Sequence, residues 1–101
     1  MPKLTADELD VSGTQNFLAE YPGLAHIRVR KHGALVILES GPEHDPYAHA
    51  RLRRVSSQWW TLEMPTHSGR WQKTPFRAPR REVLAMLVDT FGWTLQPMDY
   101  P

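Results

Sequence analysis

The stretch HIRVRKHGALVILE, residues 26–39, decides the fold. In its first half Ile27 and Val29 alternate with polar side chains, which is the period of a strand with one face in water. Its second half, 34–39, is apolar enough for a central strand, and Lys31-His32-Gly33 between the two halves suits a tight turn. The stretch therefore predicts a β-hairpin.

The same alternation resumes after a loop at 40–46 that is rich in proline and polar residues. It predicts further strands at 47–53, 59–64 and 70–76, and in the first of these it places His49 on the same side as Arg51 and Arg53. The last strand is expected at an edge of the sheet or to end at Pro75, because proline cannot donate a ladder hydrogen bond. Connections this short favour antiparallel neighbours, since parallel pairs need a long crossover.

Two helices are expected to flank these strands. Ser12 followed by Gln15 fits a capping box, which predicts a short helix over 12–21. An apolar stripe that begins at Val83 predicts a longer helix over 79–91, with Gly92 as its stop. Trp93 and Leu95 are expected in a short extended tail after it. The prediction is an α+β domain, with an antiparallel meander sheet of about five strands and the C-terminal helix packed on one face.

The bulk composition indicates one domain over residues 1–101, with 1–11 as a candidate flexible N-terminal segment. The absence of cysteine excludes disulfides and thiolate metal sites. The longest strongly apolar run, Ala34–Leu38, is far shorter than the ~20 residues that span a bilayer, and the first residues lack the apolar stretch of a secretory signal. We expect a soluble, cytoplasmic protein with no membrane contact.

Charge is distributed unevenly along the chain. Residues 26–81 hold eleven of the twelve Lys and Arg residues against four acids, while both ends are acidic. If the strands pair in sequence, alternation gathers these cations, together with exposed tryptophan, on one water-facing side. The candidate binding residues are Arg28, Arg30, Arg51, Arg53, Trp59, Arg70 and Lys73.

Such a face has more than one interpretation. Our leading hypothesis is a regulatory domain that binds protein, with a homodimer as one candidate form. Exposed aromatic residues on the sheet, or the acidic segment 1–25 against the basic face of a neighbour, would provide the contact. Nucleic acid is the alternative, because guanidinium groups pair with phosphates and indole rings stack on bases. A solvated sheet face with its tryptophans packed in the core is the plainest interpretation.

Catalysis and metal binding have less support. A small ribonuclease of toxin type would need a histidine beside a carboxylate and an arginine, but no spacing requires such residues to meet. Its candidates are His26, His49 and His67, Glu39 or Glu63, and Arg51 or Arg53. Glu43-His44-Asp45 with His49 is the densest group of potential metal ligands, yet it lacks the spacing of a zinc site. We expect no enzyme, no metal and no cofactor.

Several short motifs carry a family resemblance over residues 26–92. They are Leu38-Glu39, Ala50-Arg51-Leu52-Arg53, Trp60-Thr61-Leu62 and Gly69-Arg70-Trp71, followed by the amphipathic helix. This order resembles a family of small uncharacterised bacterial proteins of unknown function, which implies a bacterial or phage origin and transfers no catalytic residue. The strands-then-helix order is also similar to the repeat of Pur-type nucleic-acid-binding proteins, a likeness of fold that does not fix function.

Overall fold

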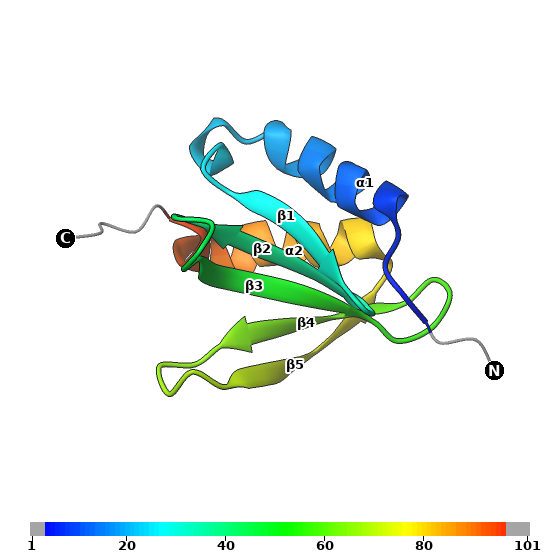
Figure 1. Ribbon diagram of the computed structural model, residues 1–101. Helices are drawn as coiled ribbons and strands as arrows, with labels where there is room; N and C mark the ends of the chain where they lie inside the picture. Colours follow the sequence, from blue (N-terminus) through cyan, green and yellow to red (C-terminus); the bar gives the residue numbers. More distant parts are fainter. Residues whose placement is uncertain (1–3, 97–101) are drawn as a thin grey trace.

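The computed structural model describes residues 4–96 and confirms the predicted fold class (Figure 1). One antiparallel sheet has the strand order β1-β2-β3-β4-β5, which is the predicted meander. Its strands are β1 (Arg28–His32), β2 (Leu35–Ser40), β3 (Tyr47–Arg54), β4 (Trp60–Pro65) and β5 (Trp71–Ala78). Helix α1 (Glu8–Ala19) and a short 3-10 turn η1 (Pro22–Leu24) precede the sheet, and helix α2 (Arg80–Phe91) and a 3-10 turn η2 (Gly92–Leu95) follow it.

Both helices lie on the same side of the sheet. Helix α1 packs on β1 and on α2, while α2 packs on β4 and β5. Alternate strand residues meet these helices in one core, as the two-residue period requires. The core includes Phe17, Leu18, Val36, Leu38, Leu52, Leu62, Val83, Leu84 and Leu87. None of the helices in the described residues covers the opposite side, which we call the open face.

Helix α1 begins at Glu8, so the predicted start at Ser12 is wrong. The Asp7 carboxylate accepts a hydrogen bond from the Asp10 N–H, and the Asp10 carboxylate accepts one from the Asp7 N–H, each at 2.9 Å. This reciprocal pair satisfies two backbone donors at the helix start, four residues earlier than expected. Residues 8–11, which we placed in the N-terminal segment, therefore form the first turn of the helix.

The C-terminal end also differs from the prediction. Helix α2 ends at Phe91, just before the expected stop at Gly92, but Gly92 keeps a helical φ of −54°. The chain continues as η2, whereas we expected Trp93 and Leu95 in an extended tail. Leu95 is fully buried in the core, so its burial favours the turn over an extended course.

A β-bulge interrupts the alternation of β3. Leu38 pairs with Ala50 and Glu39 pairs with Ala48, so His49 is the extra residue between the two pairs. His49 is fully buried and bonded to η2, on the helix-covered side. The expectation that His49 points to the same side as Arg51 and Arg53 is therefore wrong, because a bulge shifts the two-residue period by one.

Strand β5 lies at an edge of the sheet, as Pro75 predicts. Its pairing with β4 is irregular between Thr61 and Glu63, opposite the proline. The Thr74 hydroxyl donates to the Leu62 carbonyl at 2.9 Å, which supplies a donor where proline has none. The strand can therefore continue past the proline to Ala78.

Candidate functional sites

The strand register places six cations on the open face, and the sequence analysis named five of them. Arg28 pairs with Glu39 and Arg30 with Ile37, and Ile37 in turn pairs with Arg51, so these side chains share one side of the sheet. The pairs of Glu63 with Arg51 and Lys73 extend the same side to β5. We call this set the arginine face, and it comprises Arg28, Arg30, Arg51, Arg53, Lys73 and Arg77.

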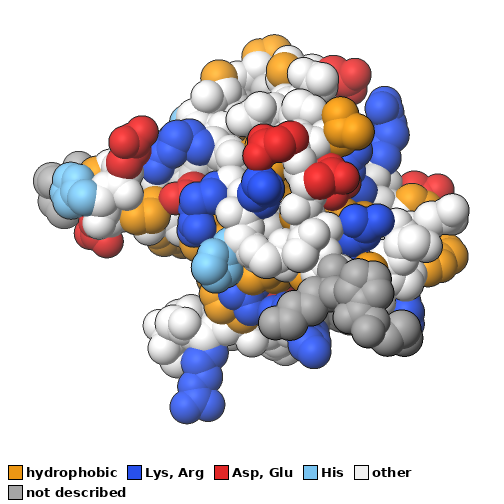
Figure 2. Space-filling view, turned by 45° about the vertical axis from the view of Figure 1, so that its right-hand side comes forward, with side chains coloured by type: hydrophobic (Ala, Val, Ile, Leu, Met, Phe, Trp, Pro, Cys, Tyr) orange, Lys and Arg blue, Asp and Glu red, His pale blue; other side chains and the backbone are white. Residues whose placement is uncertain are grey.

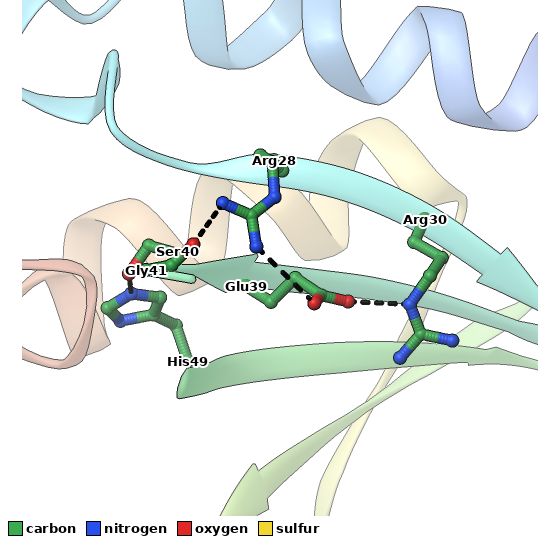
Figure 3. A network of polar contacts seen from close by, with 6 residues as sticks. All are labelled: Arg28, Arg30, Glu39, Ser40, Gly41 and His49. Atoms are coloured by element: carbon green, nitrogen blue, oxygen red, sulfur yellow. Dashed lines mark hydrogen bonds and ion pairs between the residues drawn. The ribbon is translucent and has the colours of Figure 1, made fainter. Parts of the chain in front are cut away.

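Glu39 holds the two arginines of β1 (Figure 3). Arg30 Nε donates to Glu39 Oε1 at 2.6 Å, and Arg28 Nη2 lies 3.8 Å from Oε2. Arg28 also donates through Nη1 to the carbonyl of Gly41, in the loop after β2. The side chain of Glu39 is only 7% exposed, so the carboxylate is shielded from water. Both guanidinium groups remain partly exposed to solvent.

Glu63 holds the two arginines of β3 in the same way. Arg51 Nε donates to Oε1 and Arg53 Nε to Oε2, each at 2.7 Å, and the carboxylate is 1% exposed. Burial raises the pKa of Glu63, but the hydrogen bonds and charges of Arg53 and Arg51 outweigh it, so the pKa lies below its usual 4.5. Glu63 is therefore ionised at neutral pH.

These pairs leave positive charge and hydrogen-bond donors at the surface. Each carboxylate is shared by two guanidinium groups, so each cluster keeps a net positive charge. Arg30, Arg51 and Arg53 use Nε for the carboxylate, and within residues 4–96 their terminal amino groups make no hydrogen bond. Figure 2 shows Lys and Arg side chains interspersed with acidic ones rather than in an unbroken basic patch.

The tryptophans divide between the core and the surface. Trp60 is buried in the core at 3% exposure, whereas Trp59, just before β4, is 44% exposed. Trp71 is half-buried, and the guanidinium carbon of Arg51 lies 4.3 Å from its ring centroid. One face of the Trp71 ring is therefore covered by a cation of the same chain.

The structure gathers five of the seven predicted residues on the arginine face: Arg28, Arg30, Arg51, Arg53 and Lys73. Arg70 lies in the exposed turn between β4 and β5, outside the sheet. Trp59 is the residue just before β4, so it also lies outside the sheet. Arg77 is the member that sequence reasoning missed. Its spacing of four residues from Lys73 was the available signal, but we had ended the strand at Phe76 because of the proline.

A pocket of about 680 Å³ lies on the helix-covered side of the sheet, at the end where β3 begins and β4 ends. Strands β3 and β4 pair only from Arg51 to Arg54, and beyond these pairs the β4–β5 hairpin diverges from β3 (Figure 1). The space between the hairpin, β3 and η2 is the pocket, which we call the hairpin pocket. Its apolar walls are Tyr47, Met64, Phe76, Phe91 and Trp93.

Two histidines fix η2 beside this pocket. His49 Nδ1 donates to the Thr94 carbonyl at 2.7 Å, which leaves Nε2 of the neutral ring to accept from the Ser40 hydroxyl at 2.6 Å. His26 Nε2 donates to the Leu95 carbonyl at 2.6 Å. Burial lowers the pKa of His49; the bond to Thr94 opposes this effect and the charge of His26 adds to it.

The candidate catalytic histidine His49 does not meet the candidate carboxylates and arginines. His49 is on the helix-covered side, whereas Glu39, Glu63 and the arginines bonded to them are on the open face. His67 lies in the exposed turn after β4. Within residues 4–96, no three His, Asp or Glu side chains come close enough together to hold a metal ion.

No protein-family model, curated protein or solved structure matches this chain. The resemblances to a bacterial family and to the Pur-type repeat therefore stay predictions. In the described part of the chain, no helix has the length and apolar character needed to cross a membrane. The functional inference consequently rests on the arginine face and the hairpin pocket.

Proposed function

We propose that this protein is a small non-enzymatic binding domain that recognises an acidic protein segment on its arginine face. The observation that carries the proposal is that two buried glutamates hold four arginines in fixed positions on an uncovered sheet face. The bound segment belongs to another protein or to a second copy of this chain.

The fixed positions favour binding for a physical reason. Ordering a free arginine side chain costs up to about 2 kcal/mol of rotamer entropy. The bonds from Nε already order the side chains of Arg30, Arg51 and Arg53. Only part of the entropy cost of ordering them therefore remains when a partner binds. The outward amino groups can then donate in pairs to a carboxylate.

The aromatic residues favour a protein partner over nucleic acid. Single-stranded nucleic acid binds to open ring faces that lie within a continuous basic groove. Here Trp60 is in the core, and one face of Trp71 is covered by Arg51.

A second copy of the chain offers suitable chemistry. Asp7, Glu8 and Asp10 stand together at the start of α1, and Asp7 and Glu8 are exposed there. Contact between this acidic end and the arginine face of a neighbour would form a dimer. Light scattering at low and high salt tests this form, because a dimer held by ion pairs dissociates as salt rises.

Single-stranded nucleic acid is the second candidate. One observation favours it. Trp59 is 44% exposed, and in the sequence it comes shortly after Arg51 and Arg53, the two arginines that Glu63 holds. It predicts a steep fall of affinity with salt, since each phosphate contact releases counterions.

The test measures binding of a poly-glutamate peptide and of an oligo-thymidine strand by fluorescence polarisation. We expect the peptide to bind, and Lys73→Gln with Arg77→Gln to weaken it by roughly 5-fold or more. Both residues are exposed, so the melting temperature should not change. Arg81→Gln, an exposed cation on α2, is the matched control and should bind normally.

Other outcomes decide between the candidates. Tighter binding of the oligonucleotide than of the peptide at equal salt would transfer the proposal to nucleic acid. Binding of neither at low salt, or equal loss in the Arg81→Gln control, would contradict the arginine face as a site.

A further inference from the structure

We propose that His26 and His49 form a latch that holds η2 on the sheet, opens in mildly acidic solution and then releases Leu95 from the core. We call this pair the histidine latch. It lies on the helix-covered side of the sheet, so the inference is independent of the arginine face. It rests on the hydrogen bonds of the two rings, the burial of Leu95 and the groups that surround His49.

The histidine latch joins segments that are far apart in the sequence. His49 Nδ1 donates to the Thr94 carbonyl at 2.7 Å, and His26 Nε2 donates to the next carbonyl, that of Leu95, at 2.6 Å. The two rings meet edge to face, with centroids 5.7 Å apart. Two successive carbonyls of η2 are therefore bonded to one pair of rings.

Leu95 is the side chain that the latch keeps in place. It is fully buried, and burial of a leucine contributes about 1.5–3 kcal/mol to stability. A 3-10 turn as short as Gly92–Leu95 has little stability of its own. Docking of η2 therefore depends on the Leu95 contacts and the two histidine bonds. Trp93 and Thr94 of η2 also line the hairpin pocket, so release of η2 opens that pocket to solvent.

Protonation affects the two rings differently. In His26 the added proton goes to Nδ1, which makes no hydrogen bond within residues 4–96, so Nε2 keeps its bond to η2. In His49 the added proton goes to Nε2, which accepts from the Ser40 hydroxyl at 2.6 Å (Figure 3). The hydroxyl must then turn and accept instead, and the fully buried ring carries a charge. His49 is therefore the ring at which acid acts.

The surroundings of His49 do not offset that charge. The titratable side chains that face it are His26 and Tyr47, whose ring centroids lie 5.7 and 5.0 Å from that of His49. Within residues 4–96, neither histidine forms an ion pair with a carboxylate. Glu39 lies on the open face, and the acidic residues of 43–45 are exposed. Because burial lowers the pKa of His49, the open form binds the proton more tightly, and acid shifts the balance toward that form.

The experiment follows the ¹⁵N-labelled protein by NMR from about pH 7.5 to about pH 5. Imidazole ¹⁵N shifts report the protonation of His49, and chemical-exchange saturation transfer reports the open population of the η2 amides. We expect both to rise over the same pH range, the open population by up to about 10-fold per pH unit for each proton bound. The amides of residues 83–87 should stay closed, because core packing holds this part of α2.

Matched variants test the assignment to the latch. His49→Gln should remove most of the pH dependence of η2 opening, and His67→Gln, in the exposed turn, should retain it. His26→Gln should reduce the dependence only in part, since it removes one neighbouring charge and leaves the buried ring.

Three results would overturn the proposal, and each can be read from the wild-type protein without a variant. The first is η2 amides that stay closed while His49 takes up its proton. The second is opening of residues 83–87 together with η2, which would indicate global unfolding. The third is a His49 ring that is still neutral at about pH 5.

Discussion

Arg51 binds Glu63 and covers Trp71 with a single guanidinium group. Its Nε donates to Glu63 Oε1 at 2.7 Å, and its central carbon lies 4.3 Å from the centroid of the Trp71 ring. One side chain of β3 thus connects to β4 and to β5. Charge reversal at Arg51 would disrupt the sheet as well as any binding, so Lys73 and Arg77 are the better test of function.

Loss of the Glu63 charge should destabilise the fold. Glu63→Gln keeps the shape but replaces two charge-assisted hydrogen bonds with weaker ones, at a cost of about 2 kcal/mol in the free energy of unfolding. Urea denaturation measures this change. Glu8→Gln removes a carboxylate that is 82% exposed and paired with Lys31, and should cost less than about 0.5 kcal/mol. Equal effects at the two sites would contradict the importance of burial.

Stability should fall on mild acidification because of His49. Its pKa in the folded protein lies below the ordinary 6.5, so the folded state binds fewer protons than the unfolded state in this range. The contribution of His49 to the free energy of unfolding is complete above pH 6.5 and is lost as the pH falls through the lowered pKa. We expect a lower urea midpoint at about pH 5.5 than at about pH 7.5.

Two histidine variants check that His49 causes this pH dependence of stability. His49→Gln should show a smaller difference between the two pH values, since the buried titrating group is gone. His67→Gln, in the exposed turn, should retain the full difference. A wild-type difference that His49→Gln leaves unchanged would assign the effect to another group.

The start of α1 should depend on Asp7 and not on Ser12. Asp7→Ala removes an N-cap acceptor and should lower the free energy of unfolding. Ser12→Ala should change stability by less than about 0.5 kcal/mol, because the Ser12 hydroxyl only donates back to the Leu9 carbonyl at 3.3 Å. Thermal or urea unfolding of the two variants checks the order, and the reverse order would restore the cap that the sequence suggested.

The local pattern of the sequence was sufficient for the elements and their order. The strands alternate with a clear two-residue period, and the stripe that starts at Val83 defines α2. The start of α1 was ambiguous, because Asp7 with Asp10 and Ser12 with Gln15 both resemble a capping pair. Neither pattern alone says which pair the tertiary contacts of the helix will favour.

The candidate sites depend on register, which the sequence specifies less directly. Alternation placed the arginines on one side, but it did not show that Glu39 and Glu63 each lie between two of them. The bulge at His49 has no local signature, and it moved that residue to the opposite side. The hairpin pocket exists because β4 diverges from β3 after Glu63, which is a property of the assembled sheet.

The most direct test of the proposed function is a map of where an acidic polypeptide binds. Poly-glutamate titrated into the ¹⁵N-labelled protein at low salt should shift the amides of β1, β3 and β5 around the arginine face, and added salt should reverse the shifts. Shifts confined to α1 and α2, or none at all while the protein remains folded, would contradict recognition of an acidic segment by this face.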